Sequence, residues 1–254
     1  MTTQPQDQLN QWLTLEMQMT VFHKDAQHDL HHERASDWFQ RIAGDEFSST
    51  RKTLVRTDEA KVDNKHYSLT NDPLKVTWNV SAVPDVTNGS IDELPSLGSF
   101  EQASQEFHDT LGWFLDECPE ITRIGFVPRL VYKTDSKEET YKFLDTCLKD
   151  IKVDPSSQEF QYRINRPRKS DVIAGLAINR LSTWTAAKFA IRAVSGDQTQ
   201  NQPVISHTHY GCVLQLDINT DADRKESIEH ESLHKLWDEL AKMAAEIVHE
   251  GDIQ

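Results

Sequence analysis

Strict alternation of apolar and polar residues marks the clearest strand of this chain. In residues 74–82, LKVTWNVSA, every second residue is apolar and the residues between them are polar. A period of two predicts a half-buried strand, because successive side chains of a strand point to opposite faces. The expected core-side residues are Leu74, Val76, Trp78, Val80 and Ala82. Further strands are expected at 121–132, 158–165, 172–183, 186–194 and 204–218.

Apolar residues spaced three and four apart predict helices among and after these strands. Ser99 and Gln102 form the pattern of a capping box at the start of one helix, and Ser136 and Glu139 form a second such pattern. The longest helix is expected at about 224–249, where one apolar seam continues to the end. The residues of this seam are Leu233, Trp237, Leu240, Ala244 and Ile247.

The order of these elements predicts the fold class. Because helices separate only some of the strands, we expect an α+β fold with a largely antiparallel sheet, packed helices and a long C-terminal helix. Residues 1–50 are polar and rich in histidine, and we expect them to be a mostly helical segment of their own. Residues 51–254 are expected to form the α+β domain.

Charge and cysteine usage limit the partners and the compartment. The chain has 41 acidic and 27 basic residues, and its net charge of -14 repels nucleic acid and anionic membranes unless a local basic patch overrides the average. No apolar run approaches the length of a membrane span, and the first residues lack the pattern of a signal peptide. Cys118, Cys147 and Cys212 are far apart and odd in number, which is typical of core thiols in a reducing cytoplasm.

Residues 230–234, HESLH, match the H-E-x-x-H pattern of many zinc peptidases. On a helix, His230 and His234 share one face, and Glu231 would be the general base. Catalytic zinc needs a third protein ligand, however, and His249 would lie about 22 Å from His234 in an unbroken helix. We therefore expect a packing helix with the motif on its polar side, and we predict no metal, cofactor or catalytic residue. A zinc-dependent hydrolase is the alternative.

The stretch RINRPRK, residues 163–169, contrasts with the acidic average. Pro167 interrupts a strand there, so the basic side chains are expected at or near a hairpin tip. Arginines at a turn suit bidentate contacts with carboxylates or phosphates. The turn could pair with the protein's own acidic surface, or it could contact an acidic partner or a nucleic acid. The candidate binding residues are Arg163, Arg166, Arg168 and Lys169.

Three segments together carry a resemblance to a known family. These are LKVTWNV, then ITRIGFVPRL after an amphipathic helix, and VLQLDIN leading into LHKLWDELAKMAAEIVHE. In this order they resemble a sporadically distributed, uncharacterised bacterial family of about this length. The chain departs from the family pattern in two places: the family usually begins with an apolar strand near the N-terminus, and its Arg-Ile-Gly strand continues to Asn-Arg where this chain has Pro128 before Arg129.

The resemblance implies little about chemistry, because the family has no established activity and no catalytic residue carries over. It implies that the last helix is a packing element, and its patchy distribution suggests mobile gene cassettes in which anti-phage defence and toxin modules are common. Our leading hypothesis is a non-catalytic cytoplasmic binding or assembly subunit whose partner is a protein, either operon-encoded or a second copy. The alternatives are the zinc-dependent hydrolase and a nucleic-acid-binding subunit that uses residues 163–169.

Overall fold

The computed structural model describes residues 11–24, 31–84, 93–193 and 204–252. In this part of the chain one antiparallel sheet of eleven strands forms the centre of the molecule. The first strands are β1 (Leu13–His23), β2 (Ser48–Lys52), β3 (Val55–Val62), β4 (Lys65–Asn71), β5 (Lys75–Ala82) and β6 (Ile121–Phe126). The others are β7 (Arg129–Thr134), β8 (Gln161–Asn165), β9 (Arg168–Lys169), β10 (Ala177–Ala193) and β11 (Val204–Thr220).

The order of the strands places the first of them in the middle of the sheet. The order is β2-β3-β4-β5-β1-β6-β11-β10-β8, while β7 pairs with β1 and β11, and β9 pairs with β10. The helices are α2 (His31–Ala43), α3 (Phe100–Leu111), α4 (Phe114–Glu117), α5 (Lys137–Cys147) and α6 (His230–Glu250). The expected α+β fold with a long C-terminal helix is therefore confirmed. None of the described helices is long and apolar enough to cross a membrane.

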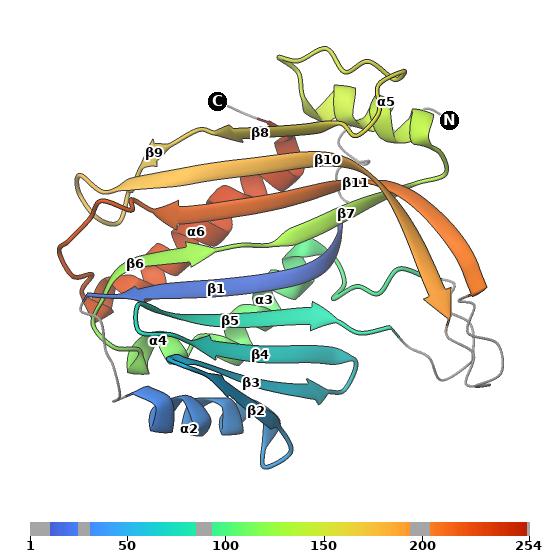
Figure 1. The fold of residues 1–254 in the computed structure, drawn as a ribbon. Coiled ribbons are helices and arrows are strands. Elements are labelled where there is room, and N and C mark those ends of the chain that lie inside the picture. The colour runs from blue at the N-terminus through green and yellow to red at the C-terminus, as the bar shows by residue number, and fades with distance from the viewer. Residues whose placement is uncertain (1–10, 25–30, 85–92, 194–203, 253–254) are drawn as a thin grey trace.

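The described helices pack against one face of the sheet and leave its other face without a helix. Contacts join α2 to β3 and β4, α3 to β1, α5 to β10 and β11, and α6 to β6, β10 and β11. Figure 1 views the molecule from the side opposite these helices, so that the strands lie in front of α3 and α6. We call this front side the open face. It is the part of the fold that positions the candidate site.

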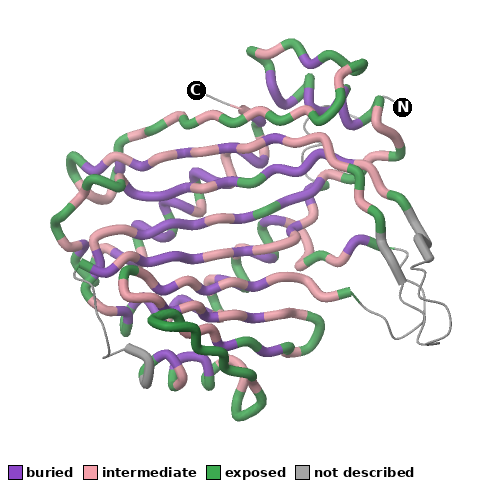
Figure 2. The backbone as a smooth tube through the Cα atoms, viewed as in Figure 1, coloured by how far each residue is buried: buried purple, intermediate pink, exposed green. Residues whose placement is uncertain are grey.

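Burial along the central strands follows the predicted alternation. Val76, Trp78 and Val80 of β5 are buried on the helix side, as expected from the sequence. Figure 2 shows the same alternation as changes of colour along the strands of the sheet. The prediction for Leu74 was wrong, because this side chain is 61% exposed. It precedes the strand, in a turn where the Asp72 carboxylate accepts hydrogen bonds from the backbone N–H groups of residues 74 and 75.

The expected helix starts are present with one difference. Ser99 and Gln102 form the complete capping box of α3. The Ser136 hydroxyl accepts a hydrogen bond from the Glu139 backbone N–H in α5, but the Glu139 carboxylate accepts from Asp135 rather than from the cap residue. Both helices thus begin where the sequence indicates.

The prediction of a mostly helical segment at residues 1–50 was wrong for β1. This eleven-residue strand pairs with β5, β6 and β7, so it belongs to the main sheet and not to a separate segment. Its Met17, Met19 and Val21 are buried on the helix side, whereas Gln18 and Thr20 point to the open face. Polar open-face residues lowered the apparent hydrophobicity of the segment and obscured its period of two.

Two predicted strand boundaries also differ from the structure. The strands expected at 172–183 and 186–194 are one strand of seventeen residues, β10, whose register to β11 continues through Trp184 and Ala186. The strand expected at 121–132 is divided into β6 and β7 at Val127 and Pro128. Proline lacks a backbone donor, which explains why regular pairing stops there.

Candidate binding surface

The HESLH motif lies at the start of α6 and connects this helix to α4. The Nδ1 atom of His230 is 3.2 Å from the Leu115 carbonyl oxygen, and the Nε2 atom of His234 is 2.8 Å from a carboxylate oxygen of Asp116. The Glu231 side chain is exposed. Among the described residues no group of three or more His, Cys, Asp or Glu side chains is arranged to hold a metal. The motif therefore makes packing contacts between two helices.

The apolar seam of α6 lies where the sequence predicted it. All five predicted residues are buried, and Trp237 packs edge-to-face on Phe126 with ring centroids 4.9 Å apart. The structure also buries Glu239, which the sequence analysis did not single out. Its carboxylate accepts hydrogen bonds from the Ser170 hydroxyl at 2.6 Å and from the Asp171 backbone N–H at 2.5 Å. This helix therefore also anchors the loop before β10.

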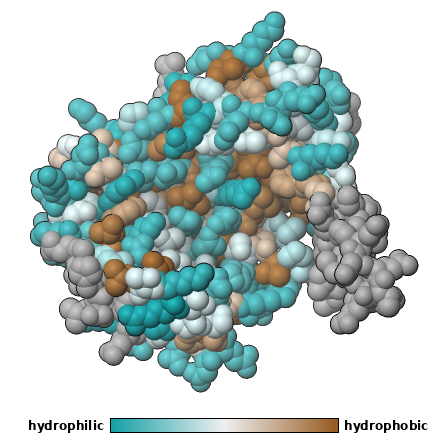
Figure 3. Space-filling model, viewed as in Figure 1, coloured by the Kyte–Doolittle hydropathy of each residue, from teal (hydrophilic) through white to brown (hydrophobic). Residues whose placement is uncertain are grey.

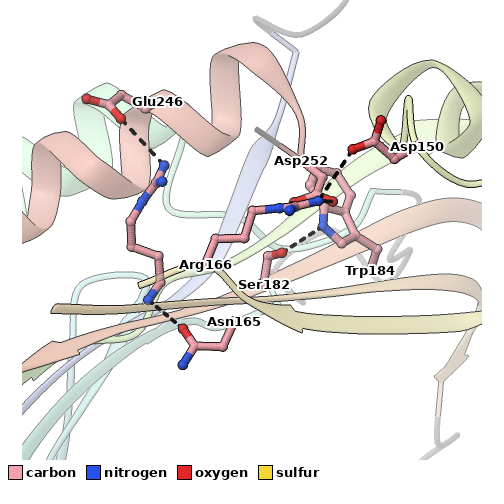
Figure 4. A network of polar contacts seen from close by, with 8 residues as sticks. Asp150, Asn165, Arg166, Ser182, Trp184, Glu246 and Asp252 are labelled. Carbon is pink, nitrogen blue, oxygen red and sulfur yellow. Dashed lines mark hydrogen bonds and ion pairs between the residues drawn. The ribbon is translucent and has the colours of Figure 1, made fainter. Parts of the chain in front are cut away.

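The four basic residues of the 163–169 stretch divide between the two faces of the sheet. Arg166 points toward the C-terminal end of the chain, where it donates two hydrogen bonds of 2.8 and 2.9 Å to Asp252 (Figure 4). The hydrogen bond to Asp252 raises the pKa of the Arg166 guanidinium. Arg168 donates to Glu246 of α6 at 2.6 Å. These two arginines are therefore engaged by the protein's own carboxylates.

A third arginine, which sequence reasoning missed, lies beside this pair. The Arg180 side chain is fully buried between β10 and α6, with Nη2 3.5 Å from Glu246. Its Nε and Nη1 atoms have no hydrogen-bond partner among the described residues. Burial, followed by the charge of Arg168, lowers the pKa of the Arg180 guanidinium. The available signal was the period of two in β10, because Ile178, Ser182 and Trp184 are buried and lie on the same side of the strand as Arg180.

Arg163 and Lys169 point to the open face. Arg163 lies opposite Thr183, and Lys169 lies opposite Ala177, both of which are on the side of β10 away from α6. Both basic side chains are exposed, and no carboxylate within ion-pair distance is found for either in the described part of the chain. The structure does not bring all four predicted binding residues together. It leaves two of them available on the open face.

A row of hydroxyl and amide side chains crosses the middle of the open face. Residues that face one another in the registers of neighbouring antiparallel strands share one side of the sheet. Following the registers from β2 to β10 gives Thr50, Thr57, Thr70, Thr77, Thr20, Gly125, Asn219 and Asn179. The Thr20 and Thr77 hydroxyls are 3.2 Å apart, and Asn179 donates to Asn219 at 3.2 Å. This threonine row is uncharged.

Basic residues lie in two rows on either side of this band. One row lies two residues along each strand from the threonine row, and it contains Lys52, Lys75, Arg123 and Lys169. The row four residues away on the other side contains Lys61, Arg129 and Arg163, with His66 and Glu16 between them. We call these the first and the second basic row. None of their seven cations has a carboxylate within ion-pair distance among the described residues.

The charge of the open face is opposite to the charge of the chain. Among the side chains that the structure describes, the basic residues on the strands of this face are the seven of the two rows and Lys133. The acidic residues are Glu16, Glu59 and Asp217. Basic side chains therefore predominate here, although the whole chain has 41 acidic and 27 basic residues. Figure 3 shows this face as mainly hydrophilic side chains with smaller apolar groups among them.

An apolar group at one end of the open face was not predicted from the sequence. Val131 and Val213 face each other in the register of β7 and β11, and both are buried together with Leu94. Partly buried residues around them are Leu13, Leu15, Ala187 and Phe189. The polar part of the open face thus ends at this small second core.

The cysteines are not placed for nucleophilic chemistry. Cys118, Cys147 and Cys212 are free and buried, as expected for core thiols. Burial raises the pKa of the Cys118 and Cys147 thiols to about 12, and it also raises the pKa of Cys212. A thiol with such a pKa carries almost no thiolate at neutral pH.

Comparison with known proteins adds no function. No protein-family model matches the chain, and no curated protein matches it either. The resemblance to the uncharacterised bacterial family therefore stays a prediction from the quoted segments. The chain differs less from the family pattern at its start than the sequence suggested, because β1 is an early strand with a buried apolar side.

Proposed function

We propose that this protein is a non-catalytic binding subunit that contacts an acidic partner through the open face of its sheet. The observation that carries the proposal is the accumulation, on this face of an acidic protein, of Lys and Arg side chains that have no carboxylate partner in the described part of the chain. A basic face on a chain of net charge -14 is more informative than scattered lysines, because the average composition opposes it. Helices bury the other face, so partner contact through the strands requires no unfolding.

Two further features support a binding role. The histidines of HESLH contact Leu115 and Asp116, so the motif has a structural explanation that requires no metal. Arg166 and Arg168 are paired internally, which confines the available charge of the 163–169 stretch to Arg163 and Lys169. A cytoplasmic location and a defence or toxin context are part of this proposal on the grounds of cysteine usage and family resemblance alone.

Retention on an immobilised polyanion tests the proposal. At low salt and pH 7.5 the wild-type protein is expected to be retained on heparin, which a chain of this charge would otherwise avoid. The variant R129E/R163E/K169E should lose retention. The matched control is K142E/K235E/K242E, which makes the same charge change at exposed positions on α5 and α6. Failure of the wild type to be retained, or equal loss in both variants, would refute the proposal.

Metal content tests the hydrolase alternative. Protein purified without a histidine tag from a zinc-replete culture is expected to contain well under one equivalent of zinc. A stoichiometric zinc that is removed by a chelator and lost in H230A would favour the hydrolase instead.

A further inference from the structure

We propose that the acidic partner is a nucleic-acid duplex, whose two phosphate backbones contact the first and the second basic row. This inference rests on the proposed function and specifies the chemistry of the partner. It replaces the idea that residues 163–169 act as one binding turn, because only Arg163 and Lys169 of that stretch reach the open face.

The spacing within each row indicates a polymer rather than a small anion. Neighbouring strands are about 4.8 Å apart, so Lys75 and Arg123, two strands apart, are separated by roughly 10 Å. Arg129 and Arg163 are three strands apart, or about 14 Å. A single phosphate or carboxylate can contact at most two neighbouring cations of a row. A chain of regularly spaced negative charges can contact several at once.

The distance between the rows indicates two backbones. Along β1 the first row passes Phe22 and the second passes Glu16, and along β10 they pass Ala177 and Thr183. Six residues of a strand span about 20 Å. One extended acidic peptide or one nucleic-acid strand would follow a single row, whereas a duplex presents two phosphate chains. The nine strands from β2 to β8 extend over about 38 Å, close to one duplex turn of about 34–36 Å.

The side chains between the rows suit the backbone of a duplex and not splayed bases. Phosphates and sugars accept hydrogen bonds from Ser, Thr, Asn and Gln side chains. Side chains of these four types make up most of the open face between the two basic rows. Single strands are usually held by stacking of bases on exposed aromatic rings. Phe22 is an aromatic residue of the first basic row, but the Arg123 guanidinium lies over its ring, 4.6 Å from the centroid. The covered face of this ring does not offer a surface for base stacking. Binding is therefore expected to be independent of sequence.

The acidic residues of the open face limit the affinity, since Glu16 lies within the second basic row opposite Arg129 and Asp217 lies between the two rows. Glu16 accepts a hydrogen bond from Asn79, and Asp217 accepts one from Asn219 at 2.7 Å. These hydrogen bonds hold the two carboxylates in place but leave their negative charge. The charge of the whole chain still repels a polyanion at long range, so we expect binding that weakens steeply as salt is added.

Fluorescence anisotropy with a labelled 24-base-pair duplex tests the inference. Release of counterions predicts that log K falls against log salt concentration with a slope of about -0.9 per phosphate contact, so seven cations give a slope up to about -6. The variant R129E/R163E/K169E should reduce the slope by about 3 and weaken binding at least 100-fold at 50 mM salt. The control K142E/K235E/K242E should keep the wild-type slope. Thermal melts verify that both variants fold.

The outcomes separate this inference from the proposed function. A higher affinity for the duplex than for a single strand of equal length, with the expected loss in R129E/R163E/K169E, supports both the proposed function and the duplex. Retention on heparin together with binding to polyglutamate, but not to duplex DNA or RNA, would leave the proposed function standing and overturn the duplex. Equal salt slopes for the two triple variants would also overturn the duplex, because binding would then depend on the net charge of the protein and not on the cations of the open face.

Discussion

Truncation of Trp237 tests the conclusion that HESLH belongs to a packing helix. The Trp237 side chain is 2% exposed, and its ring contacts Phe126 edge-to-face and stacks on Phe107 with centroids 5.9 Å apart. Trp→Ala in a core costs about 3–5 kcal/mol through lost burial and the cavity left behind. For a chain of this size each kcal/mol lowers Tm by roughly 2–4 °C. W237A should therefore melt about 6–20 °C below the wild type.

The matched control on the same helix is E231A. Glu231 is exposed, and exposed substitutions usually change the free energy of unfolding by about 0.5 kcal/mol or less. Urea titrations and thermal melts of both variants, with a binding measurement on each, provide the comparison. If W237A melts within about 2 °C of the wild type, our account of the seam is wrong. If E231A folds normally but has lost all function, the motif is an active site and the packing interpretation fails.

Three further predictions concern charged and titratable groups. R166A should lower the free energy of unfolding by about 2 kcal/mol, since it leaves the 5% exposed carboxylate of Asp252 without its bidentate partner, whereas R163A at an exposed position should leave it unchanged in the same urea titration. R180M should leave the free energy of unfolding unchanged or raise it by up to about 2 kcal/mol. The reason is that Met is apolar, whereas the buried Arg180 cation has two nitrogen atoms, Nε and Nη1, without a hydrogen-bond partner among the described residues. A clear loss in Tm would contradict this. The folded-state pKa values of Cys118 and Cys147, about 12, lie above the ordinary value of 9.0, so the thiols favour the folded state below pH 9 and this contribution is lost between pH 9 and 12. Replacing both cysteines by Ala should therefore flatten the stability profile over that range, and an unchanged slope would refute the assignment.

Local patterns in the sequence were sufficient for much of the fold. The period of two in β5 identified its buried side through Trp78, and the spacing in α6 identified Trp237 and its neighbours. The capping residues Ser99 and Ser136 located the starts of two helices. These features depend on side chains within one turn or one strand, which is why they can be recognised without the tertiary structure.

The prediction failed where the two sides of one element have different environments. In β1 the apolar Met17, Met19 and Val21 alternate with polar residues that lie on the open face, and the mixture looked like a solvated helix. Trp184 and Thr185 lie within one continuous strand, although the sequence predicted a break at these two residues. A strand with a polar exposed face has little net hydrophobicity, so composition alone underestimates it.

The candidate site depended on the tertiary structure almost entirely. The sequence alone identified RINRPRK as basic and HESLH as a helix motif, and its composition established that the chain is acidic overall. Only the sheet decided that Arg166 and Arg168 meet Asp252 and Glu246 while Arg163 and Lys169 join cations from distant strands. The physical reason is that a row across a sheet is made by strand order and register. Both depend on which strands pair, and no short stretch of sequence contains that information.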